Sequence, residues 1–223
     1  MSVMCGRFAL ATPLEKALVV EESIDLSDLE PMNPSWNVAP TQRPAVVYLD
    51  PNNPNGPMRV KRMAWGLRPS WSRPSNTEPI NARLETVNEK PMFRDAFNHR
   101  RGLLPMDGWY EWMTTPVGQQ PWYNTHIADE VLYAAVVHEE WKGSNTSHTS
   151  FAMLTTEANE DCKKVHHRMP VLLRQHELSA WVREAVLPSP TPAGTVKCHA
   201  VSRDVNNANN DHKGLIHPLP TLF

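Results

Sequence analysis

The sequence predicts an α+β fold: one compact domain, mostly antiparallel and barrel-like β-sheet, with a few peripheral helices. Three observations support this prediction. Short apolar segments with strand-like composition recur along the 223 residues, and loops rich in Pro, Gly, Ser and Asn separate them. Only three segments favour a helix. No internal repeat, low-complexity linker or charge-rich hinge divides the chain, so a single domain spans residues 1–223.

The first third of the chain predicts one short helix and a hairpin. Residues 12–15 have the pattern of a capping box with Pro at the first helical position, which predicts a helix over residues 13–22 after an extended lead-in. Residues 45–49 predict a strand. A turn-rich loop with three prolines separates them from the alternating residues 58–65, and this arrangement is typical of a hairpin.

The remaining elements follow from the same criteria. Further strands are predicted at residues 102–104, 109–113, 131–137 and 150–154. Helices are predicted at residues 157–164 and 177–186, and the second has apolar side chains at helical spacing. Residues 203–223 predict a polar, irregular tail. Residues 1–4 are interpreted as a removable leader before Cys5.

Composition excludes several classes of protein. The chain is 40% hydrophobic and 21% charged, and no apolar run approaches the roughly 18 residues of a membrane helix. The N-terminus lacks the features of a secretory signal, so we expect a cytoplasmic protein, nucleoid-associated in a bacterium. The three cysteines, Cys5, Cys162 and Cys198, lie too far apart in sequence for a metal knuckle, and their odd number does not fit a disulfide framework.

Charge is unevenly distributed although the net charge is only −2. Residues 12–30 hold six acids and one base, whereas residues 59–101 hold ten bases and four acids. Five of the eight tryptophans lie in or beside the basic stretch: Trp36, Trp65, Trp71, Trp109 and Trp112. Bases interleaved with aromatic rings are typical of a groove for single-stranded nucleic acid. The alternative, which charge alone favours, is a solvated basic face above a Trp-rich core.

Cys5 directly follows Met4 and so can become the N-terminal residue, either by translation from Met4 or by cleavage between the two. An α-amine has a pKa of about 7.7–8.0, so part of it is uncharged near neutral pH and can attack an aldehyde. The adjacent thiol can then capture the imine and close a five-membered thiazolidine, which no lysine can do. The alternative is a buried structural cysteine.

Glu111 and His166 are candidates for proton transfer. In a strand, Trp109 and Glu111 share a face, so a pocket on that face would desolvate the carboxylate and raise its pKa. The alternative is a carboxylate at a sheet edge beside core aromatics. His166 offers an acid or base, and Arg168 offers a fork for phosphate. A metal site with Cys162 lacks a convincing set of ligands, so neither metal nor cofactor is predicted.

Seven short motifs follow one another along the chain and together resemble the SRAP family, the SOS-response-associated peptidases or abasic-site processing proteins. The resemblance spans residues 5 to about 206. The motifs are Cys5-Gly6-Arg7-Phe8, Asn37-Val38-Ala39-Pro40, Trp65-Gly66, Asn81-Ala82-Arg83 with Glu85-Thr86, Gly108-Trp109-Tyr110-Glu111-Trp112, His166-His167-Arg168-Met169-Pro170 and Val201-Ser202.

The resemblance implies a mostly β domain with a positively charged channel for single-stranded DNA. It also implies a cysteine that bonds covalently to the aldehyde of a ring-opened abasic site. Carried over by motif, Cys5 is the nucleophile, Asn81 orients the sugar, and Glu111 and His166 transfer protons. The implied DNA contacts are Arg7, Asn37, Trp65, Trp71, Arg83, Arg168 and Ser202. Family members often carry two tryptophans where this chain has Trp71-Ser72.

Three functions therefore stay open. The leading one is covalent capture of abasic sites in single-stranded DNA, which shields the lesion through a linkage that could later reverse. The second is a thiol peptidase that cleaves itself before Cys5, and the third is a non-covalent single-strand binder. Abasic single-stranded DNA is the expected partner, with replication-fork proteins as further candidates, no membrane, and a monomeric protein.

Overall fold

The computed structural model describes residues 5–18, 24–27, 32–73 and 78–220, and these form two packed β-sheets. The five-stranded sheet contains, in order, β15 (Val196–Ala200), β10 (Gly118–His126), β9 (Gly108–Thr115), β1 (Arg7–Leu10) and β3 (Ser35–Val38). All its neighbouring strands are antiparallel. Alternating side chains of β9 point to opposite faces of this sheet: Trp109 packs toward the second sheet and Tyr110 packs away from it.

The second sheet has ten strands. Its main path is β13 (Arg168–Pro170), β12 (Ser147–Glu157), β11 (Leu132–Lys142), β8 (Arg101–Met106), β4 (Ala45–Tyr48), β5 (Met58–Arg62) and β2 (Ile24–Asp25). Off this path, β14 (Leu172–Leu173) pairs with β11, while β6 (Ala64–Trp65) and β7 (Asn81–Arg83) pair with β12. The β2, β6 and β7 pairings are parallel.

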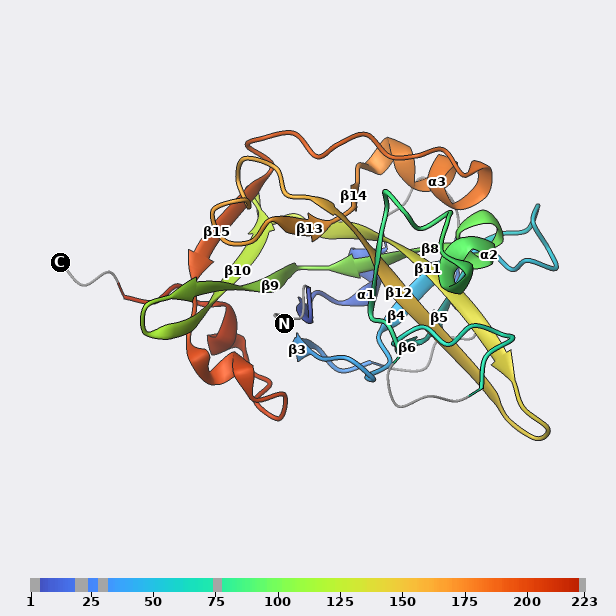
Figure 1. The fold of residues 1–223 in the computed structure, drawn as a ribbon, viewed down its shortest axis with the longest axis horizontal. Helices are drawn as coiled ribbons and strands as arrows, with labels where there is room; N and C mark the ends of the chain where they lie inside the picture. Colours follow the sequence, from blue (N-terminus) through green and yellow to red (C-terminus); the bar gives the residue numbers. More distant parts are fainter. Residues whose placement is uncertain (1–4, 19–23, 28–31, 74–77, 221–223) are drawn as a thin grey trace.

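Three apolar clusters hold the layers together. The first lies between the sheets and contains Phe8 and Trp109 from one sheet with Trp65 and Phe151 from the other. The second lies on the outer face of the larger sheet, where α2 (Pro91–His99) and α3 (Leu178–Glu184) cover it. Figure 1 shows these two helices at one end of the molecule and the C-terminal segment at the other.

The C-terminal segment forms the third cluster, on the outer face of the smaller sheet. Residues 203–220 contain two 3₁₀ helices, η2 (Arg203–Asn206) and η3 (Lys213–Ile216), which bury Val205 and Leu215 against Tyr110 and Tyr123. A further 3₁₀ turn, η1 (Gln175–Glu177), precedes α3. The expected polar, irregular tail is thus wrong for residues 203–216, because two apolar residues dock it on the sheet.

The predicted fold class is confirmed, although two packed sheets take the place of a closed barrel. The hairpin of β4 and β5 is confirmed as antiparallel, and α3 confirms the helix predicted over residues 177–186, with shorter ends. The helix predicted over residues 13–22 is α1 (Leu14–Ala17), and residues 19–22 lie outside the described residues. Its capping box is wrong: the Thr12 backbone N–H donates to the Asp107 carboxylate, 3.1 Å away.

The helix predicted over residues 157–164 is also wrong. Glu157 is the last residue of β12 and pairs with Arg168 of β13. The following residues form turns, in which the Asn159 side chain accepts from the Cys162 backbone N–H at 3.2 Å. The Asp161 carboxylate accepts from backbone N–H groups of residues 194–196, so local side-chain bonds replace a helical ladder here.

Candidate functional site

Cys5 and Glu111 are brought together by the pairing of β1 with β9. Arg7 lies opposite Tyr110, so the residues before β1 run alongside Glu111. The Cys5 backbone N–H donates to Glu111 Oε1 at 3.0 Å, and the Cys5 thiol donates to the same oxygen at 2.6 Å. Cys5 has a φ of 41°, in the left-handed region that non-glycine residues rarely adopt. One carboxylate oxygen therefore contacts both groups of a potential aminothiol.

Burial sets the protonation state of this pair. Cys5 is 0% exposed and Glu111 is 2% exposed. Desolvation raises the pKa of Glu111 to about 8, while its hydrogen bonds from Cys5 act in the opposite direction. Desolvation, followed by the Glu111 charge, raises the pKa of the Cys5 thiol well above its ordinary value. Glu111 Oε2 has no hydrogen-bond partner among the described residues, which leaves it available to carry or pass a proton.

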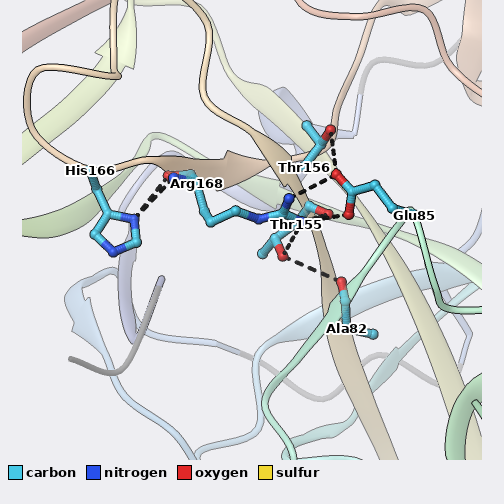
Figure 2. A network of polar contacts seen from close by, with 6 residues as sticks. All are labelled: Ala82, Glu85, Thr155, Thr156, His166 and Arg168. Carbon is cyan, nitrogen blue, oxygen red and sulfur yellow. Dashed lines mark hydrogen bonds and ion pairs between the residues drawn. The ribbon is translucent and has the colours of Figure 1, made fainter. Parts of the chain in front are cut away.

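Arg168 lies close enough to Cys5 for its charge to favour the thiolate, but its guanidinium is already paired. It donates two bonds to the Glu85 carboxylate, at 2.7 and 2.8 Å, and a third to the Thr155 carbonyl at 2.6 Å (Figure 2). This hydrogen bonding lowers the pKa of Glu85 to about 2. Arg168 is therefore a buried, neutralised charge that joins β13 to the segment after β7 across β12.

His166 precedes Arg168 and is held by its backbone. Its Nδ1 accepts from the Arg168 N–H at 3.1 Å (Figure 2), and its ring packs against that of His167 with centroids 4.3 Å apart. Burial lowers the pKa of His166, which favours the neutral imidazole. With Nδ1 accepting this bond, the neutral ring carries its proton on Nε2 and presents that N–H as a donor.

Asn81 and Arg83 occupy β7, on the opposite side of β12 from β13. Asn81 lies opposite Met153 and Arg83 opposite Thr155, so this strand runs beside the network of Arg168 and Thr155. Asn81 is half-buried and Arg83 is exposed. Arg83 therefore presents its charge to solvent from β7, which pairs with β12 where Arg168 bonds to Thr155.

Three other predicted DNA contacts gather at the docked C-terminal segment. Asn37 is 1% exposed, and its Nδ2 donates to the carbonyls of Val205, Asn207 and Asn210 at 3.2, 3.1 and 2.8 Å. Ser202 caps η2 by accepting from the Asp204 N–H. Arg7 donates to the Asn206 carbonyl at 3.5 Å, and burial lowers its pKa. The contacts of Asn37 are all internal.

The two predicted tryptophan contacts are placed very differently. Trp65 is fully buried between the sheets, packs edge-on against Phe8, and donates to the Ile80 carbonyl at 2.9 Å. Trp71 is 64% exposed. Only Trp71 of this pair can meet a ligand without rearrangement of the core.

The comparison with protein families decides which family this arrangement belongs to. The family model described as "SOS response associated peptidase (SRAP)" matches residues 4–208, which include all the site residues that the sequence predicts. The chain belongs to the SRAP family. It is 29% identical to the abasic site processing protein YoaM of Bacillus subtilis, with 96% of this chain and 97% of YoaM covered. It is 27% identical to the abasic site processing protein YedK of Escherichia coli, with 97% and 100% covered.

Solved structures share the fold of this chain. A crystal structure of a protein from Bacteroides thetaiotaomicron superposes with a TM-score of 0.82 at 20% identity, covering 97% of this chain and 100% of that one. A second, from Bordetella bronchiseptica, has a TM-score of 0.73 at 21% identity, covering 89% and 100%. At these identities the likeness establishes the fold.

Two general features complete the description of this SRAP chain. No group of three or more His, Cys, Asp or Glu side chains that could hold a metal gathers within the described residues. No helix in that part of the chain is long and apolar enough to cross a membrane.

Sequence reasoning missed the partner of Arg168. Glu85 belongs to the same motif as Asn81 and Arg83. A carboxylate at such a position is only a weak signal for an ion pair with a distant arginine. The separation of 83 residues hides that pairing until the register of β7, β12 and β13 is known.

Proposed function

We propose that this chain processes abasic sites in single-stranded DNA, with Cys5 as the covalent nucleophile. The proposal rests on one observation above all: the Cys5 nitrogen and thiol both contact Oε1 of a buried glutamate. The names of the SRAP relatives, abasic site processing proteins, agree with this substrate. A ring-opened abasic deoxyribose carries an aldehyde, which is the electrophile that an aminothiol captures.

The chemistry requires Cys5 to be N-terminal. Its uncharged α-amine adds to the aldehyde carbon, which gives a carbinolamine, and loss of the former aldehyde oxygen as water gives an imine. The Cys5 sulfur then adds to the imine carbon while the thiol proton is transferred to the nitrogen. The product is a thiazolidine in which one carbon carries both the new C–N and the new C–S bond, and no oxidant or reductant is consumed.

Glu111 is the proton carrier in this scheme. Since its pKa is raised to about 8, it is mostly protonated at neutral pH and can donate a proton to the departing hydroxyl. As a carboxylate it can accept the proton of the amine or of the thiol, which both lie within 3.0 Å of Oε1. His166 is the second carrier, Asn81 orients the opened sugar, and Arg83 holds a phosphate.

Self-cleavage before Cys5 is the second candidate activity, and it would supply the α-amine. The positive φ of Cys5 strains the backbone next to the Met4–Cys5 bond, and the thiol lies beside a carboxyl group that can move its proton. The thiol would attack the Met4 carbonyl carbon, the Cys5 nitrogen would leave with a proton, and water would release residues 1–4. Intact mass checks this: a terminus retained at Met1 or Ser2 together with full crosslinking would contradict a requirement for N-terminal Cys5.

The proposal is tested by incubating the protein with matched abasic and intact oligonucleotides, followed by denaturing electrophoresis. We expect an adduct only with the abasic strand, and none from Cys5→Ala. A denaturation-resistant adduct of Cys5→Ala would refute the thiazolidine. If the wild type binds both strands and forms no adduct, the protein is a non-covalent binder; release of Met4 without any DNA adduct would leave only the peptidase.

A further inference from the structure

Trp71 is carried by a loop whose backbone is tied to the β11–β12 hairpin at three alternate residues. The Arg68 N–H donates to Ser150 Oγ at 2.9 Å, and the Ser70 N–H donates to the Glu139 carboxylate. The Ser72 carbonyl accepts from the Trp141 Nε1–H at 2.8 Å. Residues 69–72 form a turn in which the Ser72 N–H donates to the Pro69 carbonyl at 3.0 Å, and Trp71 within this turn is 64% exposed.

The anchors are themselves fixed. Glu139 lies directly opposite Ser150 in the hairpin, its side chain is 3% exposed, and it pairs with Arg100 at 2.7 Å. The Arg68 guanidinium lies over the Trp141 ring, 5.3 Å from its centroid. Gly143 approaches the same ring so closely that an added Cβ would lie 2.7 Å from it. The hairpin thus offers the loop a rigid support, visible as the long yellow strands of Figure 1.

The exposed indole of Trp71 is suited to stack on a nucleobase. Nucleobases stack on aromatic rings irrespective of sequence, and stacking on a ring that is already fixed avoids the entropic cost of ordering it. Arg73, two residues on, is also exposed and adds positive charge for a phosphate. Within the described part of the chain, the Trp71 ring has no aromatic, cation–π or hydrogen-bond partner that a base would need to displace.

We propose that Glu139 and Trp141 are positioning residues that hold Trp71 as a preformed stacking platform for a base of single-stranded DNA. This inference rests on the proposed function and adds to it, because it assigns to the β11–β12 hairpin a part in DNA binding without direct contact to the strand. Trp141 acts through its indole N–H, so replacing the indole by a phenyl ring removes the bond to Ser72 and keeps an aromatic ring.

The test is a double-mutant cycle on the Kd for an intact oligonucleotide, which has no aldehyde and forms no covalent bond. We expect Trp71→Ala to weaken binding about tenfold, the size of one lost stacking contact. Trp141→Phe should weaken it about threefold, as one lost hydrogen bond would. In the Trp71→Ala background, Trp141→Phe should have no further effect, since the platform is already absent.

Trp181→Phe is the matched control. It also exchanges an indole for a phenyl ring and loses an N–H bond to a carbonyl, that of Gly102 at 3.0 Å, but it lies in α3. Its effect on Kd should be the same with and without Trp71. The proposal is overturned if Trp141→Phe weakens binding equally in both backgrounds, if it has no effect, or if Trp71→Ala has none. Adduct formation with the abasic strand, measured separately, judges the Cys5 chemistry independently.

Discussion

Two glutamates of this site show how environment alone separates the roles of identical side chains. Glu111 is buried, and desolvation raises its pKa to about 8. Glu85 is paired with a guanidinium and has its pKa lowered to about 2. One is therefore an acid that can donate near neutral pH, and the other is a permanent anion that neutralises Arg168. Only the first has a pKa that suits proton transfer near neutral pH.

Glu111 makes stability depend on pH in a definite direction. The native state keeps its proton up to about pH 8, whereas an unfolded glutamate loses it near 4.5. Between these values the native state holds more protons, so the free energy of unfolding falls as pH rises, with a slope approaching about 1.4 kcal/mol per pH unit. Glu111→Gln should remove this fall.

Denaturant unfolding of both proteins at several pH values from 5 to 9 checks the expectation. The difference between mutant and wild type isolates Glu111 from other titrating groups such as His138, since these are common to both. Parallel stability profiles would mean that Glu111 is already ionised in the native protein at neutral pH, and its assignment as a proton donor would be wrong.

At the scale of elements, strands with a clear alternation of apolar and polar residues were predictable. Segments where side-chain hydrogen bonds to the backbone replace helical hydrogen bonds were not. The β4–β5 hairpin follows from alternating residues around a Pro-rich turn, and it forms as expected. The segment after Glu157 has helix-forming composition, yet Asn159 and Asp161 bind backbone N–H groups and stop a helix. The α2 helix was not predicted, although Pro91 at its first position and apolar Phe93, Ala96 and Phe97 at helical spacing are signals for it.

The sequence predicts candidate site residues but not their contacts. The motifs identify Cys5 and Glu111, but their contact spans 106 residues and depends on the register of β1 on β9. The burial of Trp65 also depends on the five-stranded sheet, whose Phe8 packs against it and which no local pattern near Trp65 reveals. A motif can therefore name a residue without telling whether its side chain faces a ligand or the core.

Asn37 joins β3 to the C-terminal segment, so we expect its side chain to stabilise the docking of that segment. Removing its side chain leaves three carbonyls without that donor, so Asn37→Ala should lower the free energy of unfolding by about 1–3 kcal/mol. Hydrogen exchange should rise across residues 203–216. Asn209→Ala, an exposed change in the same segment, is the control and should stay within about 0.5 kcal/mol. Unchanged stability and exchange in Asn37→Ala would contradict this anchoring role.

At the scale of the whole molecule, the layers of the fold separate the Cys5–Glu111 contact from part of the basic stretch of residues 59–101. Cys5, which contacts Glu111, belongs to the cluster between the two sheets. The helices α2 and α3 cover the opposite face of the larger sheet (Figure 1). The basic stretch of residues 59–101 contributes to both regions, since Arg83 lies on β7 and Arg94 on α2. A net charge of −2 disfavours a general coat on DNA and favours local binding.

Arg83→Ala and Arg94→Ala distinguish local from general attraction, because both residues are exposed and each change makes the net charge one unit more negative. A local groove requires Arg83→Ala to weaken single-strand binding and to reduce the slope of log K against log salt by about 0.7, the value for one lost phosphate contact. Arg94→Ala should leave both quantities close to the wild type. Titrations at several salt concentrations measure them. Equal losses in the two variants would show that overall charge governs binding, and Arg83 on β7 would then have no special part in holding DNA.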